Sequence, residues 1–553
     1  MSNVNGKSDV TPTESETTRT VGNSPRGSRE TPATSTVSMT ADRSEKARCH
    51  KPDMHVAGES DSPIVPAKSA NKGSVPLSAE SMEERGLTKE NIGPSLLDRT
   101  QRRNSDGMPF VPRSRGLLGV REAARKDQKL RFTSLLHHLT PELLRTSFFD
   151  LKKQAAPGVD EQTWHDYAED FERRIDDLHG RIHRGAYRAK PSKRTYIPKP
   201  DGKMRPLGIA ALEDKLVQQA ARTVLECIYE QDFLGFSYGF RPRRDQHRAL
   251  DALYVGITKR KVNWVIDADI RGFFDNISHE WLMKFLEHRI ADRRMLRLLK
   301  KWLRAGVSEN GEWSPTTVGT PQGAVISPLY ANVFLHYVLD LWINDWRKCH
   351  AQGEVTIVRY ADDFVIGFRE ESDARRCLAD LKERFARFGL ELHPEKTRLI
   401  EFGRYAAERR AKRGAGRPET FDFLGFTHIS GKTRRGDFTI HRKTARKKFQ
   451  AKVKDIKAKL MRRLHADLSQ VGSWLRSVLR GWYQYYAVPG NYRRLQQFRD
   501  AIQDLWLRVL RRRSQRGRRF TWEKFARVCK PWLPSPKILH PYPNVRFTSQ
   551  HPR

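Results

Sequence analysis

The chain has 553 residues, long enough for three or four domains at roughly 150 residues each. Lys and Arg number 103 against 65 Asp and Glu, and this formal net charge of +38 indicates a polyanionic partner such as nucleic acid, although a merely soluble basic surface has the same composition. The 5 cysteines lie far apart, so we expect a reducing compartment, no zinc knuckle and no disulfide partner. No apolar stretch is long enough to predict a signal peptide or a membrane span.

The first elements in chain order follow a long polar segment. Residues 1–105 are rich in Ser, Thr, Pro, Gly and charge, which predicts a disordered N-terminal extension. Apolar residues return at helical spacing after Leu117. Residues 214–228 then carry one apolar stripe, which predicts an amphipathic helix.

The middle of the chain combines strands and helices. Residues 262–268 are typical of a buried strand, and residues 354–360 and 364–368 of two more, joined by Ala-Asp-Asp in a tight hairpin. A helix is expected over 371–389, with Gly389 as its C-cap. Strands that alternate with helices predict an α/β or α+β domain.

Beyond Gly431 the spacing predicts basic helices. The segment 441–468 places apolar residues on one helix face and Lys and Arg on the rest, and 474–486 and 494–520 form two further helical units. The last residues, 540–553, have no periodicity.

Two acidic segments lie where apolar strands end. Asp362 and Asp363 occupy the tip of the predicted hairpin, and their mutual repulsion is costly unless a cation is bound, although an Asp-Asp pair alone is usually a solvated turn. Asp269 follows another strand, on the same side as Asp267. Hard carboxylate oxygens suit Mg²⁺ or Mn²⁺. One strand-end acid with two hairpin-tip acids is the ligand set for two metal ions, which stabilise both the attacking and leaving oxygens of phosphoryl transfer.

Eight ordered blocks extend this pattern along the chain. They are AAPGVD (155–160), KPDGKMRPLGIAALEDKLVQ (199–218), FSYGFRP (236–242), DADIRGFFDNISH (267–279), GTPQGAVISPLYANVFLH (319–336), RYADDFVIGF (359–368), GLELHPEKTRLIEFG (389–403) and FDFLGF (421–426). Together they resemble the bacterial group II intron-encoded proteins, which are reverse transcriptases and RNA maturases.

The resemblance implies a right-hand polymerase fold, α+β, with an antiparallel sheet in the fingers and palm and an α-helical thumb/maturase domain. We expect five regions: a disordered extension at 1–105, the N-terminal region and fingers at 106–260, the palm at 261–430, the thumb/maturase domain at 431–497 and a basic DNA-binding-like region at 498–553. Related proteins often end in a nuclease module with paired cysteines. Only Cys529 follows residue 500, so we expect no such module here.

Family roles transfer to matching positions in the palm. Asp269, Asp362 and Asp363 match the catalytic and metal-binding triad, and the Ile270 carbonyl matches a further metal-facing group. Phe274 matches an aromatic gate that rejects ribonucleotides, with an ordinary core aromatic as the alternative.

The remaining family positions concern the incoming nucleotide. Lys203 and Arg205 resemble residues that hold its triphosphate, and Gln322 resembles one that touches its sugar. Lys396 resembles an active-site Lys. A surface charge is the alternative for Lys203, Arg205 and Lys396. The implied cofactors are two Mg²⁺ (Mn²⁺ possible), and the implied substrates are dNTPs.

Basic residues outside the palm predict nucleic-acid contacts. RGWYQYYAVPGN (480–491) resembles the maturase signature, whose aromatics suit RNA stacking or a helix core, and RVLRRRSQRGRRF (508–520) resembles the family's DNA-binding region. The predicted nucleic-acid-binding residues are Arg241, Lys447, Lys448, Arg480, Arg511, Arg512 and Arg513.

The leading hypothesis is an RNA-directed DNA polymerase that also binds its own intron RNA and assists splicing and retrohoming. Its expected partners are group II intron RNA, an RNA template with a DNA primer, and target DNA, in the bacterial cytoplasm and at the nucleoid. Two alternatives stay open: a domesticated reverse transcriptase in phage defence or spacer acquisition, and a splicing cofactor without polymerase activity.

Overall fold

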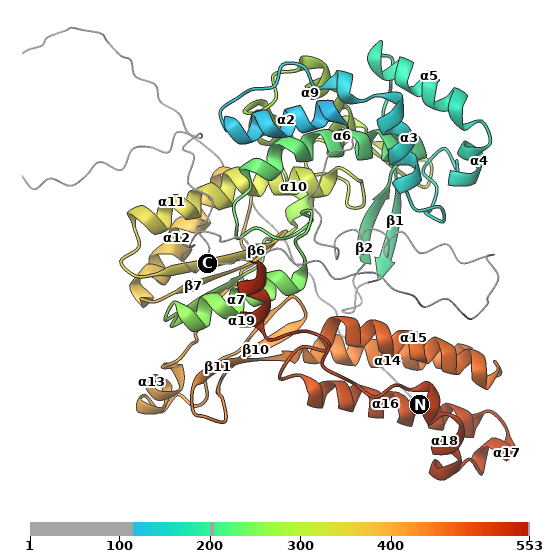
Figure 1. Cartoon of the computed structure of the whole chain (residues 1–553), viewed down its shortest axis with the longest axis vertical. Helices are drawn as coiled ribbons and strands as arrows, with labels where there is room; N and C mark the ends of the chain where they lie inside the picture. The colour runs from blue at the N-terminus through green and yellow to red at the C-terminus, as the bar shows by residue number, and fades with distance from the viewer. Residues whose placement is uncertain (1–113, 199–203, 551–553) are drawn as a thin grey trace, which may run out of the picture. The chain divides into compact units, whose positions relative to one another are not determined.

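The structure is a computed structural model that describes residues 114–198 and 204–550 (Figure 1). The predicted extension at residues 1–105 and the candidate Lys203 lie outside the described residues. Within the described part, no helix combines the length and apolar character needed to cross a membrane.

The described chain begins with short helices whose first turns are capped by side chains. The Ser114 hydroxyl accepts a hydrogen bond from the Leu117 N–H, and Thr140 caps the next α-helix in the same way, just ahead of a proline. These elements are α2 (Arg115–Lys126), η1 (Leu136–His138), α3 (Pro141–Asp150), α4 (Trp164–Ala168) and α5 (Phe171–His183). Helices α2 and α3 pack on the long α6 (Leu212–Asp232), which extends the predicted helix at both ends.

A four-stranded sheet with the order β2-β1-β4-β5 follows these helices. Strands β1 (Ser192–Pro198) and β2 (Met204–Ile209) are antiparallel, and β1 runs parallel to β4 (Val307–Glu309), which pairs with β5 (Glu312–Ser314). This sheet carries Arg205, on β2.

The second sheet is antiparallel, has the order β6-β7-β3-β8 and is buried on both faces. Its strands are β3 (Trp264–Ala268), β6 (Val355–Tyr360), β7 (Asp363–Phe368) and β8 (Arg398–Glu401). Along β7, Phe364 and Ile366 enter the core shared with α6, whereas Val365 enters the core shared with the C-terminal helices. Burial on both faces explains why these strands have continuous apolar runs.

Helices cover both faces of this sheet. Helix α7 (Gln246–Lys259) packs on β6, and α12 (Glu371–Arg387) packs on β3 and β7. Gly389 has φ +75° just beyond α12, and the Leu390 N–H donates to the Phe385 carbonyl, so the predicted glycine C-cap is present. The other helices of this region are η2 (Phe273–Asp275), α8 (His279–Glu287), α9 (Arg293–Arg304), α10 (Ser327–Leu335), the π-helical η3 (His336–Asp340), α11 (Leu341–Cys349) and α13 (Ala406–Lys412).

The prediction of helix throughout the region beyond Gly431 is wrong for its first part. Strands β9 (Phe421–Phe423), β10 (Phe426–Lys432) and β11 (Phe438–Thr444) form a third sheet, and helix begins only at Arg446. The apolar spacing of 441–468 also fits a helix with Arg442 on its solvated face. In the structure Arg442 lies in β11, is 2% exposed and forms an ion pair with Asp251 of α7.

Basic helices then follow, as predicted. They are α14 (Arg446–Arg462), α15 (Leu468–Tyr486), α16 (Tyr492–Arg512), α17 (Gln515–Arg518), α18 (Trp522–Val528) and η4 (Lys530–Trp532). Helix α16 contacts both α14 and α15. The segment predicted to lack periodicity contains α19 (Pro543–Gln550), which packs on α7 and buries Phe547.

Candidate active site

A two-residue turn presents two of the predicted carboxylates. Tyr360 pairs with Asp363, so only Ala361 and Asp362 lie between β6 and β7, one residue fewer than the sequence suggested. Ala361 has φ +58°, a left-handed conformation that is unfavourable for a residue with a Cβ, and its side chain is buried. The turn therefore holds a strained backbone at the position directly before the two acids.

The third carboxylate comes from the neighbouring strand. Ala268 at the end of β3 pairs with Phe364 of β7, which places Asp269 next to the hairpin turn. The Asp269 carbonyl accepts a hydrogen bond of 2.8 Å from the His393 N–H. Its carboxylate accepts one of 2.6 Å from Lys396 Nζ. The antiparallel pairing of β3 with β7 thus gathers three acids that are distant in the sequence.

The surroundings of this site disfavour uncompensated negative charge. Burial raises the pKa of Asp362, and the nearby Asp269 raises it further. Asp363 is exposed at the end of its strand and lines a cleft. The loss of hydration in this cleft is the larger cause and repulsion from Asp362 the next, and together they raise the pKa of Asp363 to about 7. Asp267, which accepts a hydrogen bond from Arg398, has a pKa raised to about 6, mainly by burial.

Carboxylates with raised pKa values and few cationic partners form a donor set that a divalent cation fits. As the side chains stand, no three acidic, His or Cys side chains in residues 114–198 and 204–550 converge closely enough to hold a metal ion. The carboxylate of Asp269 is instead ion-paired with Lys396, 2.6 Å away.

Two of the predicted nucleotide contacts, Arg205 on β2 and Gln322 in the loop before α10, are joined to each other. Arg205 Nε donates to Gln322 Oε1 at 2.8 Å, and the Gly208 N–H donates to the Gln322 carbonyl at 2.7 Å. Gly323 has φ +113°, and a Cβ there would lie 2.9 Å from the Gly208 carbonyl oxygen, so the close approach of the two segments requires glycine. The positive charge of Arg205 lowers the pKa of Asp362, which indicates that this pair faces the acids.

Phe274 lies in η2, close to the end of β3. Its ring is half-buried and packs edge-on against Phe273, which is 2% exposed and belongs to the core. Its carbonyl accepts a hydrogen bond of 2.8 Å from the Thr320 N–H, which ties η2 to the loop that contains Gln322. Ile270 is buried and forms a single bridge with Leu392.

Comparison with known proteins agrees with this geometry. Residues 197–428 match the family model described as reverse transcriptase (RNA-dependent DNA polymerase). Protein YkfC of Escherichia coli K12 is 32% identical over 57% of this chain and 88% of its own length. The chain belongs to the group II intron reverse transcriptases.

Two intron-encoded relatives match over smaller shares of their own length. The group II intron-encoded protein LtrA of Lactococcus lactis is 38% identical over 38% of this chain and 36% of LtrA. The putative COX1/OXI3 intron 1 protein of Saccharomyces cerevisiae is 27% identical over 58% of this chain and 46% of its own length. The chain thus spans most of YkfC but less than half of these two relatives.

The reverse transcriptase also has a cleft of about 430 Å³ beside Asp363. Lys447 and Lys448 line it from the first turn of α14, and Tyr485 lines it from α15. Tyr485 Oη donates to the Leu424 carbonyl at 2.7 Å, which fixes one wall. Asp422 lies in the same cleft and was not among the predicted residues, although the FDFLGF block that contains it was.

The structure changes the assignment of one predicted nucleic-acid contact. Arg241 is 6% exposed; its guanidinium donates to Glu230 and to the carbonyls of Leu234 and Ser237, so it is not available to a phosphate.

The remaining predicted basic contacts of the reverse transcriptase lie on α15, at the end of α16 and one residue past it. Arg480 and Arg512 are exposed. Arg511 and Arg513 each donate a hydrogen bond to a backbone carbonyl, from Phe520 and His465 respectively, and this fixes part of each side chain.

Proposed function

We propose that this reverse transcriptase extends a DNA primer on an RNA template with Asp269, Asp362 and Asp363 as its catalytic carboxylates. The observation that carries the proposal is the β3–β7 pairing, which brings Asp269 beside the strained turn of Asp362 and Asp363. Two Mg²⁺ ions, or Mn²⁺, would be held by these carboxylates and the Ile270 carbonyl. Bound ions would supply Lewis-acid stabilisation of the attacking and leaving oxygens.

The chain's own residues bind and orient the substrates around that site. Arg205 and Gln322 would hold the dNTP, since a guanidinium fork suits a triphosphate. The half-buried ring of Phe274 would crowd a ribose 2′-hydroxyl and so favour deoxynucleotides. Lys447 and Lys448 border the cleft next to Asp363 and would hold the primer backbone.

We further propose that the basic helices α14 to α16 bind group II intron RNA and assist splicing and retrohoming. Support comes from the intron-encoded relatives and from basic residues such as Arg480 and Arg512, whose side chains are exposed to solvent. Of the aromatics in the signature block, Trp482 and Tyr483 are buried in the helical core, so the grip depends more on charge than on stacking.

Primer extension on a poly-ribonucleotide template tests the first proposal. The natural chain should yield DNA with Mg²⁺ or Mn²⁺, and Asp362→Asn should yield none. No product from the natural chain with either metal would overturn the polymerase proposal. Splicing of a precursor RNA that carries the intron tests the second: Asp362→Asn should splice as well as the natural chain, and an equal loss of splicing in the folded variant would show that the two functions are not separable.

A further inference from the structure

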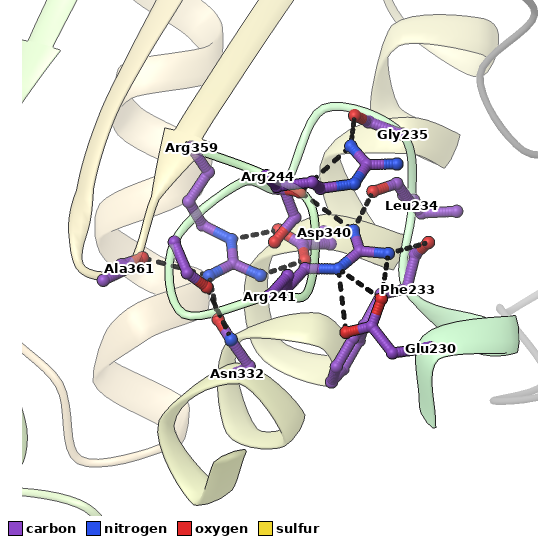
Figure 2. A network of polar contacts seen from close by, with 12 residues as sticks. Glu230, Phe233, Leu234, Gly235, Arg241, Arg244, Asn332, Asp340, Arg359 and Ala361 are labelled. Atoms are coloured by element: carbon purple, nitrogen blue, oxygen red, sulfur yellow. Dashed lines mark hydrogen bonds and ion pairs between the residues drawn. The ribbon is translucent and has the colours of Figure 1, made fainter. Parts of the chain in front are cut away.

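A buried guanidinium lies directly beneath the turn that carries Asp362. Arg359, in β6, is 0% exposed, and so is its partner Asp340. Arg359 Nε donates to Asp340 Oδ1 at 2.7 Å, and Nη2 donates to the other carboxylate oxygen. Its third nitrogen, Nη1, donates to Asn332 Oδ1 and to the Ala361 carbonyl, each at 3.0 Å (Figure 2).

The hydrogen bond to Ala361 acts at the strained position. A left-handed alanine is unfavourable by itself, so the turn needs outside contacts to keep it. The Arg359 guanidinium supplies one by binding the carbonyl that immediately precedes Asp362. Because the two remaining nitrogens are fixed by Asp340, the guanidinium cannot move without breaking an ion pair that water does not reach.

A second wall of the turn comes from the block FSYGFRP. The Tyr238 N–H donates to the Arg359 carbonyl at 2.8 Å, which runs this segment alongside β6. A Cβ on Gly239 would lie 2.2 Å from the Ala361 backbone nitrogen, and the Gly239 carbonyl accepts a hydrogen bond of 2.8 Å from Asn332 Nδ2. Asn332 therefore bridges Gly239 on one side of the turn to Arg359 on the other.

The loop that contains this wall is itself held by arginines. Arg241 binds Glu230 and nearby carbonyls, and Arg244 donates to the Gly235 carbonyl (Figure 2). Both contacts fix the conformation of this loop. This gives the FSYGFRP block a physical role next to the predicted acids, which its sequence alone did not indicate.

The π-helical turn explains how Asn332 and Asp340 reach the same guanidinium. They are separated by eight residues on α10 and η3. In a regular α-helix this spacing leaves two side chains roughly 80° apart around the axis. The wider turn of His336–Asp340 reduces that angle and brings both onto the face that meets Arg359.

We propose that Arg359, Asn332 and Asp340 are positioning residues that lock the Ala361 turn and thereby aim Asp362 and Asp363. The inference rests on the proposed catalytic role of those two acids. A loosened turn misplaces the metal-binding oxygens but leaves the primer and template contacts intact. The expected loss is therefore in kcat and in metal affinity, not in binding of primer-template.

The test uses Arg359→Lys and Asn332→Ala, assayed by primer extension with a Mg²⁺ titration. Lysine keeps the charge but loses the planar fork. Each variant should lower kcat and raise the Mg²⁺ concentration for half-maximal rate, within the roughly 10- to 100-fold range typical of residues that support metal ligands. The Kd for primer-template should stay within about twofold, since both altered side chains are buried.

Arg289→Lys is the matched control. Arg289 forms another buried ion pair, 3.0 Å from Asp232, and its guanidinium donates to the Asp127 and Leu130 carbonyls rather than to the turn. It should lower thermal stability without changing the Mg²⁺ requirement. A Mg²⁺ shift of the same size in Arg289→Lys would reduce the effect of Arg359→Lys to general destabilisation and overturn the proposal.

Hydrogen exchange separates this inference from the proposed function. Amides of residues 360–363 should exchange faster in Asn332→Ala than in the natural chain, whatever the activity. Unchanged exchange there would refute the lock, even if the enzyme is active. Conversely, faster exchange in a chain whose Asp362→Asn variant still polymerises would keep the lock and refute the catalytic assignment. If Arg359→Lys does not fold, Asn332→Ala, which keeps the Arg359–Asp340 pair, carries both measurements.

Discussion

Asp251 of α7 offers the sharpest test of how the parts of this enzyme are joined. Its carboxylate is 1% exposed and accepts hydrogen bonds from two arginines. Arg442 of β11 reaches it at 3.0 Å, and Arg546 of α19 binds its other oxygen. Asp251 thus connects α7, which packs on the second sheet, to β11 of the third sheet and to α19. Asp251→Asn preserves the shape of this group and removes its charge.

The expected cost follows from burial. Arg442 is 2% exposed, so its guanidinium would stay desolvated without a counter-charge, a situation that costs about 3–5 kcal/mol. The side chain of Arg546 is 15% exposed and can recover some hydration, so it adds less. A loss of this size corresponds to roughly a hundredfold to several-thousandfold faster exchange of amides that open with this junction.

Hydrogen exchange followed by mass spectrometry is the suitable assay, because a chain of several domains does not unfold in one step. Protection should fall in peptides from β11 and α19 and stay unchanged in α5. Glu280→Gln is the control: it breaks the exposed ion pair with Lys284, 2.6 Å away, and should leave the protection unchanged because solvent screens this pair. Equal exchange in Asp251→Asn and the natural chain would refute the reasoning that burial makes this ion pair costly to break.

Further expectations concern the active site, nucleic-acid binding and pH. Phe274→Ala should incorporate ribonucleotides in primer extension, and unchanged discrimination between deoxynucleotides and ribonucleotides would refute the gate role of Phe274. Replacing Lys448 with Gln should weaken primer-template binding and reduce its salt slope by about one, measured by fluorescence anisotropy. Arg241→Ala should lower the melting temperature but not that slope. Burial raises the pKa of Asp214 to about 6. Between its ordinary pKa of 3.8 and about 6, Asp214 keeps a proton in the folded state that the unfolded chain releases. The contribution of Asp214 to the free energy of unfolding is therefore largest below pH 3.8 and falls as the pH rises towards 6. Asp214→Asn should remove this pH dependence of the free energy of unfolding in denaturant titrations.

Local pattern was sufficient where a residue's role depends on its near neighbours in the chain. The hairpin with Asp362 and Asp363 follows from two apolar strands around a short polar link, and the glycine cap at Gly389 follows from α12's own periodicity. The acids at strand ends pointed to metal chemistry because carboxylates there are costly without a cation.

Tertiary structure decided the roles of the buried cations. Arg442 looked like one more charge on a basic helix, yet it lies in a strand and can be buried because Asp251, 191 residues away, compensates its charge. Arg359 likewise depends on Asp340, and Arg241 on the acceptors of its own loop. A sequence displays charge but not the partner that removes its desolvation cost, and that partner determines whether an arginine faces nucleic acid or holds the fold together.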